Sequence, residues 1–257
     1  MTAGVAMAAR ARTMRLDLLL VERGLYESRE QARRAVMAGS VEVEGRRIDK
    51  PGTAVPIEAV LRVAGPREPF VSRAGRKLAG ALDRFSIEPL GRVCLDVGAG
   101  TGGFTDCLLQ RGARRVYALD VGRGQLHESL RGDPRVVVLE GRNARHLAKE
   151  EVPEPVDLMT VDVSFISLRV VVPAVLPLLA PGGDLVALIK PQFEAPRGSV
   201  GKGGILRDEA LRREVIAERA RDLEALGLEL LAVIDSPLAG AGGNLEAFAH
   251  LRRWERP

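Results

Sequence analysis

The sequence has 257 residues, 46% of them apolar, which is enough for one small and one medium-sized globular domain. Its two cysteines, Cys94 and Cys107, are too few for a zinc cluster or a disulfide framework, so no metal site is predicted. The longest apolar stretch, residues 161–189, is interrupted by charged residues and prolines, which argues against a membrane-spanning helix. The first residues lack the apolar run of a signal peptide, and we expect a cytoplasmic protein.

The net charge of +4 is unevenly distributed along the chain. Residues 1–75 contain 13 Lys and Arg against 9 Asp and Glu, whereas the remainder contains 25 of each kind. A basic first third predicts a polyanionic partner for that region. Lysine is scarce, with only five among the 38 basic residues, so each lysine is a candidate for a specific role.

The chain opens with residues 1–13, which show no periodic pattern and are expected to form a disordered tail. The apolar spacing of residues 15–23 then predicts a short helix, which Gly24 ends. A second helix is predicted from Ser28, which can cap it, to Ala38.

A β-hairpin is predicted next, and its first strand is the alternating segment 41–43. Arginines form one edge of this helix-helix-hairpin module. Such a charged face can be merely solvated, or it can bind phosphates. The candidate RNA-binding residues of this module are Arg15, Arg29, Arg33, Arg34, Arg46 and Arg47.

The order of these elements resembles the S-four-type (alpha-L) RNA-binding domain. The resemblance is carried by strand 41–43 together with Arg15, Leu16, Asp17, Ser28, Arg29, Ala32 and Gly39. It implies an α+β domain over residues 14–65 that binds structured RNA by shape and phosphate contacts. Residues 66–71, which contain two prolines, are predicted to be a linker.

From residue 72 the pattern changes to that of a doubly wound, Rossmann-like α/β domain, predicted to extend to residue 257. Ser72 can cap a helix that runs to Phe85, and another long helix is predicted over 207–226. Short apolar runs separated by helix-length segments predict a largely parallel sheet. The predicted strands are 93–97, 116–119, 136–139, 158–161, 185–189, 230–234 and 247–251.

The first of these strands runs into a glycine-rich turn typical of nucleotide sites. Gly98, Gly100 and Gly103 fit the dinucleotide spacing, so the spacing alone leaves both NAD and S-adenosylmethionine (SAM) open. Asp96 would repel a pyrophosphate but attract an amino-acid ammonium, and Asp120 is placed for ribose hydroxyls, which together favour SAM. The predicted cofactor contacts are Asp96, Gly98, Ala99, Gly100, Thr101, Gly102, Gly103, Phe104, Asp120, Val121, Arg142, Asn143 and Asp162, of which Asn143 is equally interpretable as an ordinary loop residue.

Asp162 and Lys190 follow the fourth and fifth predicted strands, at the sheet edge where open α/β sheets bind ligands. Methylation of a ribose hydroxyl requires a base for its proton and a cation for the developing oxyanion. We assign Lys190 as the base, oriented by Asp162, with Lys77 steadying the oxyanion. Glu246 is a further orienting carboxylate.

At these residues the sequence resembles the TlyA family, whose catalytic domain is similar to FtsJ-type ribose methyltransferases. The matching segments are 72–78, 96–106, 118–121, 162–167, 188–193 and 243–248, with Ala74 departing from an expected glycine. The resemblance places the family's Lys-Asp-Lys-Glu tetrad on Lys77, Asp162, Lys190 and Glu246. It implies 2′-O-methylation of cytidine in ribosomal RNA.

The glycine-rich segment 198–204 is interpretable as a loop that closes over RNA through Lys202, or as a flexible surface connection. Two other functions are alternatives to ribose methylation. A catalytically inactive ribosome-assembly factor would have no use for the tetrad, and a haemolysin, a name that family members have carried, would need an apolar membrane-active segment that we do not find.

Overall fold

We describe the protein from a computed structural model, which covers residues 12–37, 39–63, 68–196, 198–201 and 203–254. The chain divides into two compact units, Met1–Arg67 and Glu68–Pro257. Most of the predicted tail and Lys202 lie outside the described residues.

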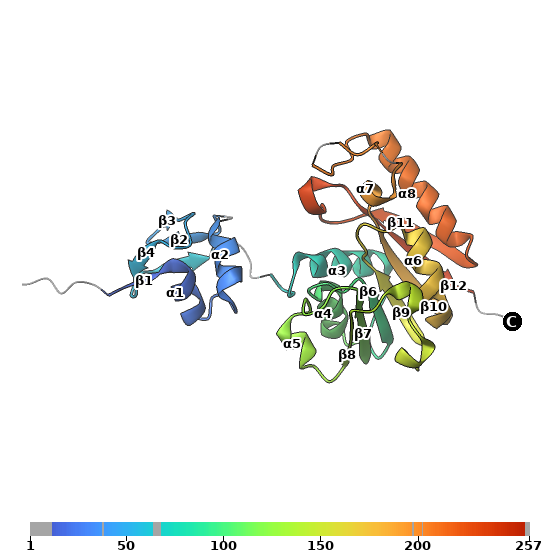
Figure 1. The fold of residues 1–257 in the computed structure, drawn as a ribbon, viewed down its shortest axis with the longest axis horizontal. Coiled ribbons are helices and arrows are strands. Elements are labelled where there is room, and N and C mark those ends of the chain that lie inside the picture. The colour runs from blue at the N-terminus through green and yellow to red at the C-terminus, as the bar shows by residue number, and fades with distance from the viewer. Residues whose placement is uncertain (1–11, 38, 64–67, 197, 202, 255–257) are drawn as a thin grey trace, which may run out of the picture. The chain divides into compact units, whose positions relative to one another are not determined.

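The first unit packs two helices against short antiparallel strands (Figure 1). Its core consists of apolar side chains from both helices and from the strands, including Leu16, Leu20 and Val41. One sheet pairs β1 with β4, and the other has the order β3-β2-β5. The elements are β1 (Thr13–Arg15), α1 (Leu16–Glu22), α2 (Arg29–Met37), β2 (Val41–Val43), β3 (Arg46–Arg47), β4 (Ala54–Pro56) and β5 (Leu61–Val63). Strand β1 thus begins at Thr13, the last residue of the predicted tail.

The second unit is built on a seven-stranded sheet of order β11-β12-β10-β9-β6-β7-β8. Strands β6 to β10 pair in parallel, whereas β12 is antiparallel to both of its neighbours. The strands are β6 (Val93–Val97), β7 (Arg115–Asp120), β8 (Val136–Glu140), β9 (Val156–Val161), β10 (Leu179–Ile189), β11 (Leu228–Asp235) and β12 (Ala247–Arg253). The predicted doubly wound fold is confirmed.

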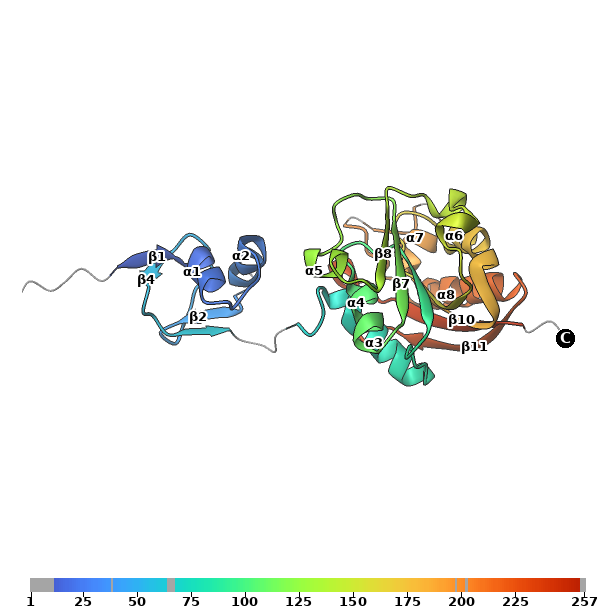
Figure 2. The ribbon, with the colours of Figure 1, turned by 90° about the horizontal axis from the view of Figure 1, so that it is seen from below.

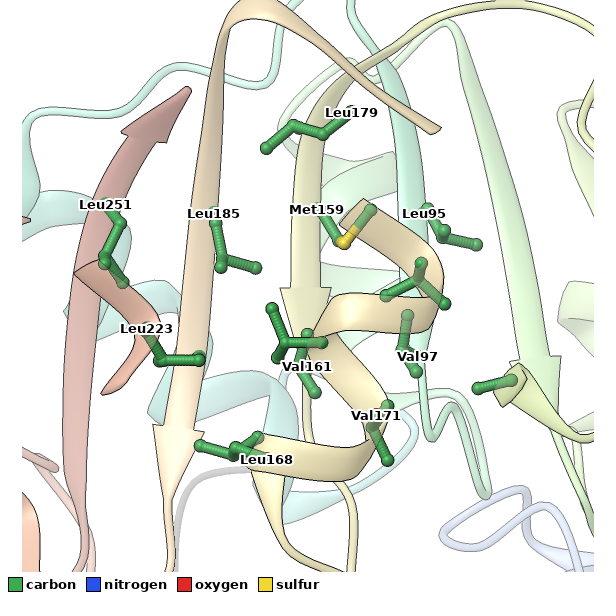
Figure 3. Packing of buried hydrophobic residues seen from close by; sticks show 14 of the residues in the cluster. Leu95, Val97, Met159, Val161, Leu168, Val171, Leu179, Leu185, Leu223 and Leu251 are labelled. Carbon is green, nitrogen blue, oxygen red and sulfur yellow. The ribbon is translucent and has the colours of Figure 1, made fainter. Parts of the chain in front are cut away.

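Helices cover both faces of this sheet (Figures 1 and 2). One hydrophobic cluster joins the sheet to α6 and α8, and its leucines, valines and Met159 interdigitate (Figure 3). A second cluster joins the other face to α3 and α4. The α-helices are α3 (Arg73–Phe85), α4 (Gly103–Gln110), α5 (Glu128–Arg131), α6 (Leu168–Val175), α7 (Pro191–Glu194) and α8 (Glu209–Glu224); 3-10 turns span Ala144–His146, Lys149–Glu151, Leu176–Leu178 and Ala241–Gly243.

Candidate active site

The sheet topology brings the predicted catalytic residues to one edge. Strands β6, β9 and β10 are parallel neighbours, so the residues that follow them share an edge. Strand β12 runs the other way, and its first residue, Ala247, pairs with Ile189, the last residue of β10. Lys190 and Glu246 are therefore neighbours, although they are far apart in the sequence.

The tetrad forms two shielded ion pairs. Lys190 Nζ lies 2.5 Å from Asp162 Oδ1, and these side chains are 13% and 17% exposed. Lys77 Nζ, from the second turn of α3, lies 2.6 Å from Glu246 Oε2, with exposures of 12% and 2%. Each amine thus faces one carboxylate in a partly desolvated position, where electrostatic interactions are stronger than in water.

Two further side chains contact these pairs, and the sequence predicted a catalytic or binding role for neither. Ser164 Oγ accepts a hydrogen bond from Lys190 Nζ at 3.0 Å. Gln192 Nε2 donates to Glu246 Oε1 at 3.3 Å. Their positions within segments 162–167 and 188–193, which carry the family resemblance, are the only sequence signal that points to them.

An aromatic pair lies in the same two segments. Phe165 is 90% exposed and has a φ of 64°, an unusual conformation for a bulky residue. Its ring lies 4.7 Å from that of Phe193, measured between centroids. This pair gives the site an exposed aromatic surface next to Ser164.

Different structural constraints explain why glycine occupies each position of the predicted cofactor turn. A Cβ at Gly98 would lie 2.3 Å from the carbonyl oxygen of Asp162, so glycine lets this turn meet the end of β9. Gly100, with φ +53°, has no atom within 4 Å of its Cβ position, and its N–H donates to Asp120 Oδ2 at 2.8 Å. Gly100 is therefore the open position of the turn.

The rest of the turn is packed against the protein. A Cβ at Gly102 would meet Leu130, and one at Gly103 would meet Ser72. Phe104 is buried, with its ring 6.1 Å from that of Phe248. Gly102, Gly103 and Phe104 therefore lie on the side of the turn that packs against the rest of the domain. The backbone of the two remaining predicted contacts is also engaged, since Ala99 N donates to the Leu119 carbonyl and the Thr101 carbonyl accepts from His127 N.

Asp96 is fully buried behind the turn. Its carboxylate accepts hydrogen bonds from the hydroxyls of Thr105, at 2.7 Å, and Thr160, at 3.3 Å. Burial raises the pKa of Asp96 to about 7, although the threonine hydrogen bonds oppose this shift. Asp96 has no exposed surface and joins β6 to α4 and β9 through these two threonines, and its predicted contact with an ammonium group stays a prediction.

Asp120 lies at the end of β7, where its two carboxylate oxygens accept hydrogen bonds from Gly100 N and Gly122 N. The loop after Asp120 is held by Glu140, whose carboxylate accepts from the backbone N–H groups of residues 124–126. Arg131 also donates to Glu140, and this hydrogen bond is the main cause that lowers the pKa of Glu140 to about 2. Glu140, which we did not predict, organises this part of the site.

The remaining predicted cofactor residues border Asp120. Val121 is 71% exposed, an unusual position for an apolar side chain. Arg142 donates its backbone N–H to the Asp120 carbonyl, and its guanidinium pairs with Glu151 at 2.8 Å. Asn143 accepts from Arg145 N and so caps a 3-10 turn, which agrees with the loop interpretation of this residue.

In the first unit, two of the predicted RNA-binding arginines have a structural partner. Arg15 and Arg29 both pair with Asp17, at 3.0 Å and 2.9 Å, and the Asp17 side chain is fully buried. The hydrogen bond from Arg15 is the main cause that lowers the pKa of Asp17 to about 2. Both arginines remain about half exposed, so their outer atoms are still accessible.

The other predicted RNA-binding arginines are exposed. Arg34 forms a weak pair with Glu30 at 3.9 Å, and Arg47 lies against Gly39. Arg33 forms no ion pair among the described residues. The arginine edge therefore contains two arginines that pair with a buried carboxylate and others that lie on the exposed surface.

Two properties of the described residues bear on alternative functions. Within them, no group of three or more His, Cys, Asp or Glu side chains is arranged to hold a metal ion. None of the helices in the same ranges has the length and apolar character needed to cross a membrane.

Both units of the chain match known protein families. The profile of the FtsJ-like methyltransferases matches residues 70–253, and that of the S4 domain matches residues 14–61. The chain is similar to the 16S/23S rRNA (cytidine-2′-O)-methyltransferase TlyA of Mycobacterium tuberculosis, with 49% identity over 94% of this chain and 91% of that protein.

Two other relatives carry a different name. Hemolysin A of Brachyspira hyodysenteriae is 42% identical over 92% of this chain and 99% of its own length. A solved structure named "Putative hemolysin from Streptococcus thermophilus" is 40% identical, with a TM-score of 0.75 over 96% of this chain and 90% of that one.

Proposed function

We infer the function from a family relationship: this chain belongs to the TlyA family of FtsJ-like methyltransferases and carries an S4 domain ahead of its catalytic domain. We propose that it is an rRNA methyltransferase that methylates the 2′-hydroxyl of cytidine in ribosomal RNA, in the cytoplasm, with SAM as methyl donor. The observation that carries the proposal is the pair of ion pairs, Lys190–Asp162 and Lys77–Glu246, beside the glycine turn.

Three features of the described residues support SAM as the cofactor. The open position at Gly100 lets a ligand approach the backbone closely. The Asp120 carboxylate beside it can accept hydrogen bonds from ribose hydroxyls, and the exposed Val121 provides an apolar surface for an adenine ring. When bound, SAM would supply an electrophilic methyl group on a sulfonium ion.

The tetrad can handle the proton and the charge that this reaction creates. A ribose hydroxyl is a weak nucleophile until its proton is taken, and the neutral form of Lys190 can take it. Asp162 orients that amine and stabilises the ammonium that results. Lys77, held by Glu246, can donate a hydrogen bond to the hydroxyl oxygen as negative charge develops there.

The test is to incubate the chain with radiolabelled SAM and each undermethylated ribosomal subunit, and then to map the labelled ribose. We expect label on a cytidine 2′-oxygen. RNA binding without transfer would instead favour an assembly factor. Calorimetric titration with SAM and NAD is a separate check, and binding of NAD but not SAM would contradict the proposed cofactor.

A further inference from the structure

The amine of Lys190 contacts two side chains of one short turn. Its Nζ donates a hydrogen bond to Ser164 Oγ at 3.0 Å and lies 2.5 Å from Asp162 Oδ1, which it contacts as an ion pair without hydrogen-bond alignment. The turn is constrained on both sides. Before it, Asp162 N donates a hydrogen bond to the Val97 carbonyl, and after Ser164 the backbone of Phe165 has a φ of 64°. Asp162 and Ser164 therefore present their oxygens to Lys190 in a defined arrangement.

The geometry of the amine gives this arrangement a consequence. A lysine nitrogen is tetrahedral and has three positions besides its bond to Cε. One of them points at Ser164 Oγ, and the Asp162 carboxylate lies beside the amine as an ion-pair partner. In the neutral amine, an N–H group fills the position toward Ser164, and repulsion by the Asp162 carboxylate directs the lone pair to the position farther from that carboxylate.

We propose that Ser164 is a positioning residue, which together with Asp162 fixes the rotation of the Lys190 amine so that its lone pair faces the target ribose hydroxyl. This inference deepens the proposed function and rests on it. The O–H bond of the ribose breaks and its proton forms a new N–H bond on Lys190. The electron pair stays on the oxygen, which bonds to the methyl group as the bond from that methyl to the donor sulfur breaks and the sulfonium is left as a neutral thioether.

Without Ser164, the amine loses the hydrogen bond that fixes its rotation, so its N–H groups and its lone pair can exchange places. The lone pair then faces the hydroxyl for only part of the time. Loss of Ser164 should therefore slow the proton transfer while leaving Asp162 and Lys190 paired. We expect an effect on the order of tenfold, a fraction of the 10²–10⁴-fold that a general base contributes.

The first experiment needs neither cofactor nor RNA. Because the chain has only five lysines, ¹⁵N-lysine labelling should give a small set of Nζ signals, which a Lys190→Arg variant assigns. We expect Ser164→Ala to accelerate hydrogen exchange at Lys190 Nζ at least threefold and to leave Lys77 unchanged. Ser167→Ala is the matched control, because Ser167 Oγ lies 2.6 Å from Glu194 and does not contact Lys190. An unchanged hydrogen-exchange rate at Lys190 Nζ in Ser164→Ala would show that Ser164 does not fix the amine and would overturn the proposal.

The second experiment compares methylation kinetics of the wild type, Ser164→Ala and Ser164→Thr. We expect about a tenfold fall in kcat for Ser164→Ala, an RNA KM within about twofold of wild type, and recovery to within about threefold in Ser164→Thr, which keeps the hydroxyl. An active wild type with an equally active Ser164→Ala would overturn this inference alone. Absence of methylation by the wild type would overturn the proposed function, and the catalytic role of Ser164 with it.

Discussion

The segment over which β10 and β12 pair carries a cluster of charges at each end, and the two clusters are built differently. At one end, Asp184 is surrounded by donors, since it accepts hydrogen bonds from His250 at 2.9 Å, Arg92 at 2.7 Å and Arg252 at 3.0 Å. At the other end, Lys190 and Glu246 belong to separate pairs, each with a single amine and a single carboxylate.

The difference shows what each cluster is suited for. Three donors on one buried carboxylate leave little capacity for a ligand, and they hold the sheet together. Burial alone would raise the pKa of Asp184, but hydrogen bonds from His250, Arg92 and Arg252 outweigh it and lower the pKa below its ordinary value. The lysine pairs retain N–H groups that a substrate can engage.

The largest expected effect is on methyl transfer and comes from substitution of Lys190. Lys190→Ala should reduce methyl transfer about 1000-fold, because it removes the proposed base. RNA affinity and the unfolding temperature should stay close to wild type, since Lys190 is not part of a core cluster. Single-turnover transfer, filter binding and thermal melting measure the three quantities. If RNA binding is lost together with transfer, Lys190 has a different role from the one proposed.

A smaller effect is expected at the opposite end. Asp184→Asn should lower the free energy of unfolding by about 2 kcal/mol, less than the ~3–5 kcal/mol of a fully buried pair, because both arginines reach solvent. The methyl-transfer rate per folded molecule should not change. Denaturant titration and kinetics below the melting temperature test this, and a variant that loses activity while fully folded would contradict the separation of the two ends.

The same cluster predicts a dependence on pH. The pKa of Asp184 is lower in the folded chain than the value of about 4 expected when unfolded, so the unfolded state binds more protons. The stabilisation is therefore complete above about pH 5 and is lost as pH falls below about 4. The stability difference between wild type and Asp184→Asn should shrink over that range, and a difference that is constant with pH would contradict this linkage.

The smallest expected effects are in the first unit, where an exposed arginine can be compared with one that pairs with the buried Asp17. Arg33→Glu removes an exposed arginine without an ion pair among the described residues, so it should weaken RNA binding several-fold and reduce the salt dependence. Arg29→Gln removes a partner of the buried Asp17 and should lower the stability of this unit by about 1 kcal/mol. RNA titration at two salt concentrations and thermal melting distinguish the two variants; equal behaviour would mean that the Asp17 pair has no structural role.

The sequence predicted much of the second unit because the signals are local. Apolar runs located all seven strands, with ends that differ by up to six residues, the largest difference being the start of β10 at Leu179. The same pattern located α3 and α8. Turn glycines and strand-end polar residues identified the segments that form the site. The prediction of the TlyA family is confirmed by the relative that is 49% identical, and the prediction of the S-four-type domain is confirmed by the S4 profile.

Other features depend on segments distant in the chain, and the sequence could not assign them. The Asp17 side chain forms ion pairs with Arg15 and Arg29, for which the sequence predicted only RNA contacts. Phe104, predicted beside the cofactor, has its side chain in the core against Phe248. Nothing in the local pattern distinguishes a side chain that faces a ligand from one that faces another helix.

The sequence by itself determined where the seven strands of the second unit and its helices α3 and α8 form, because side-chain periodicity and turn residues act over a few positions. Only the tertiary structure decided which groups meet. The antiparallel return of β12 places Glu246 beside Lys190, and the turn after β9 delivers both Asp162 and Ser164 to the same amine. These contacts arise from strand order and register, which are set by packing of the whole sheet.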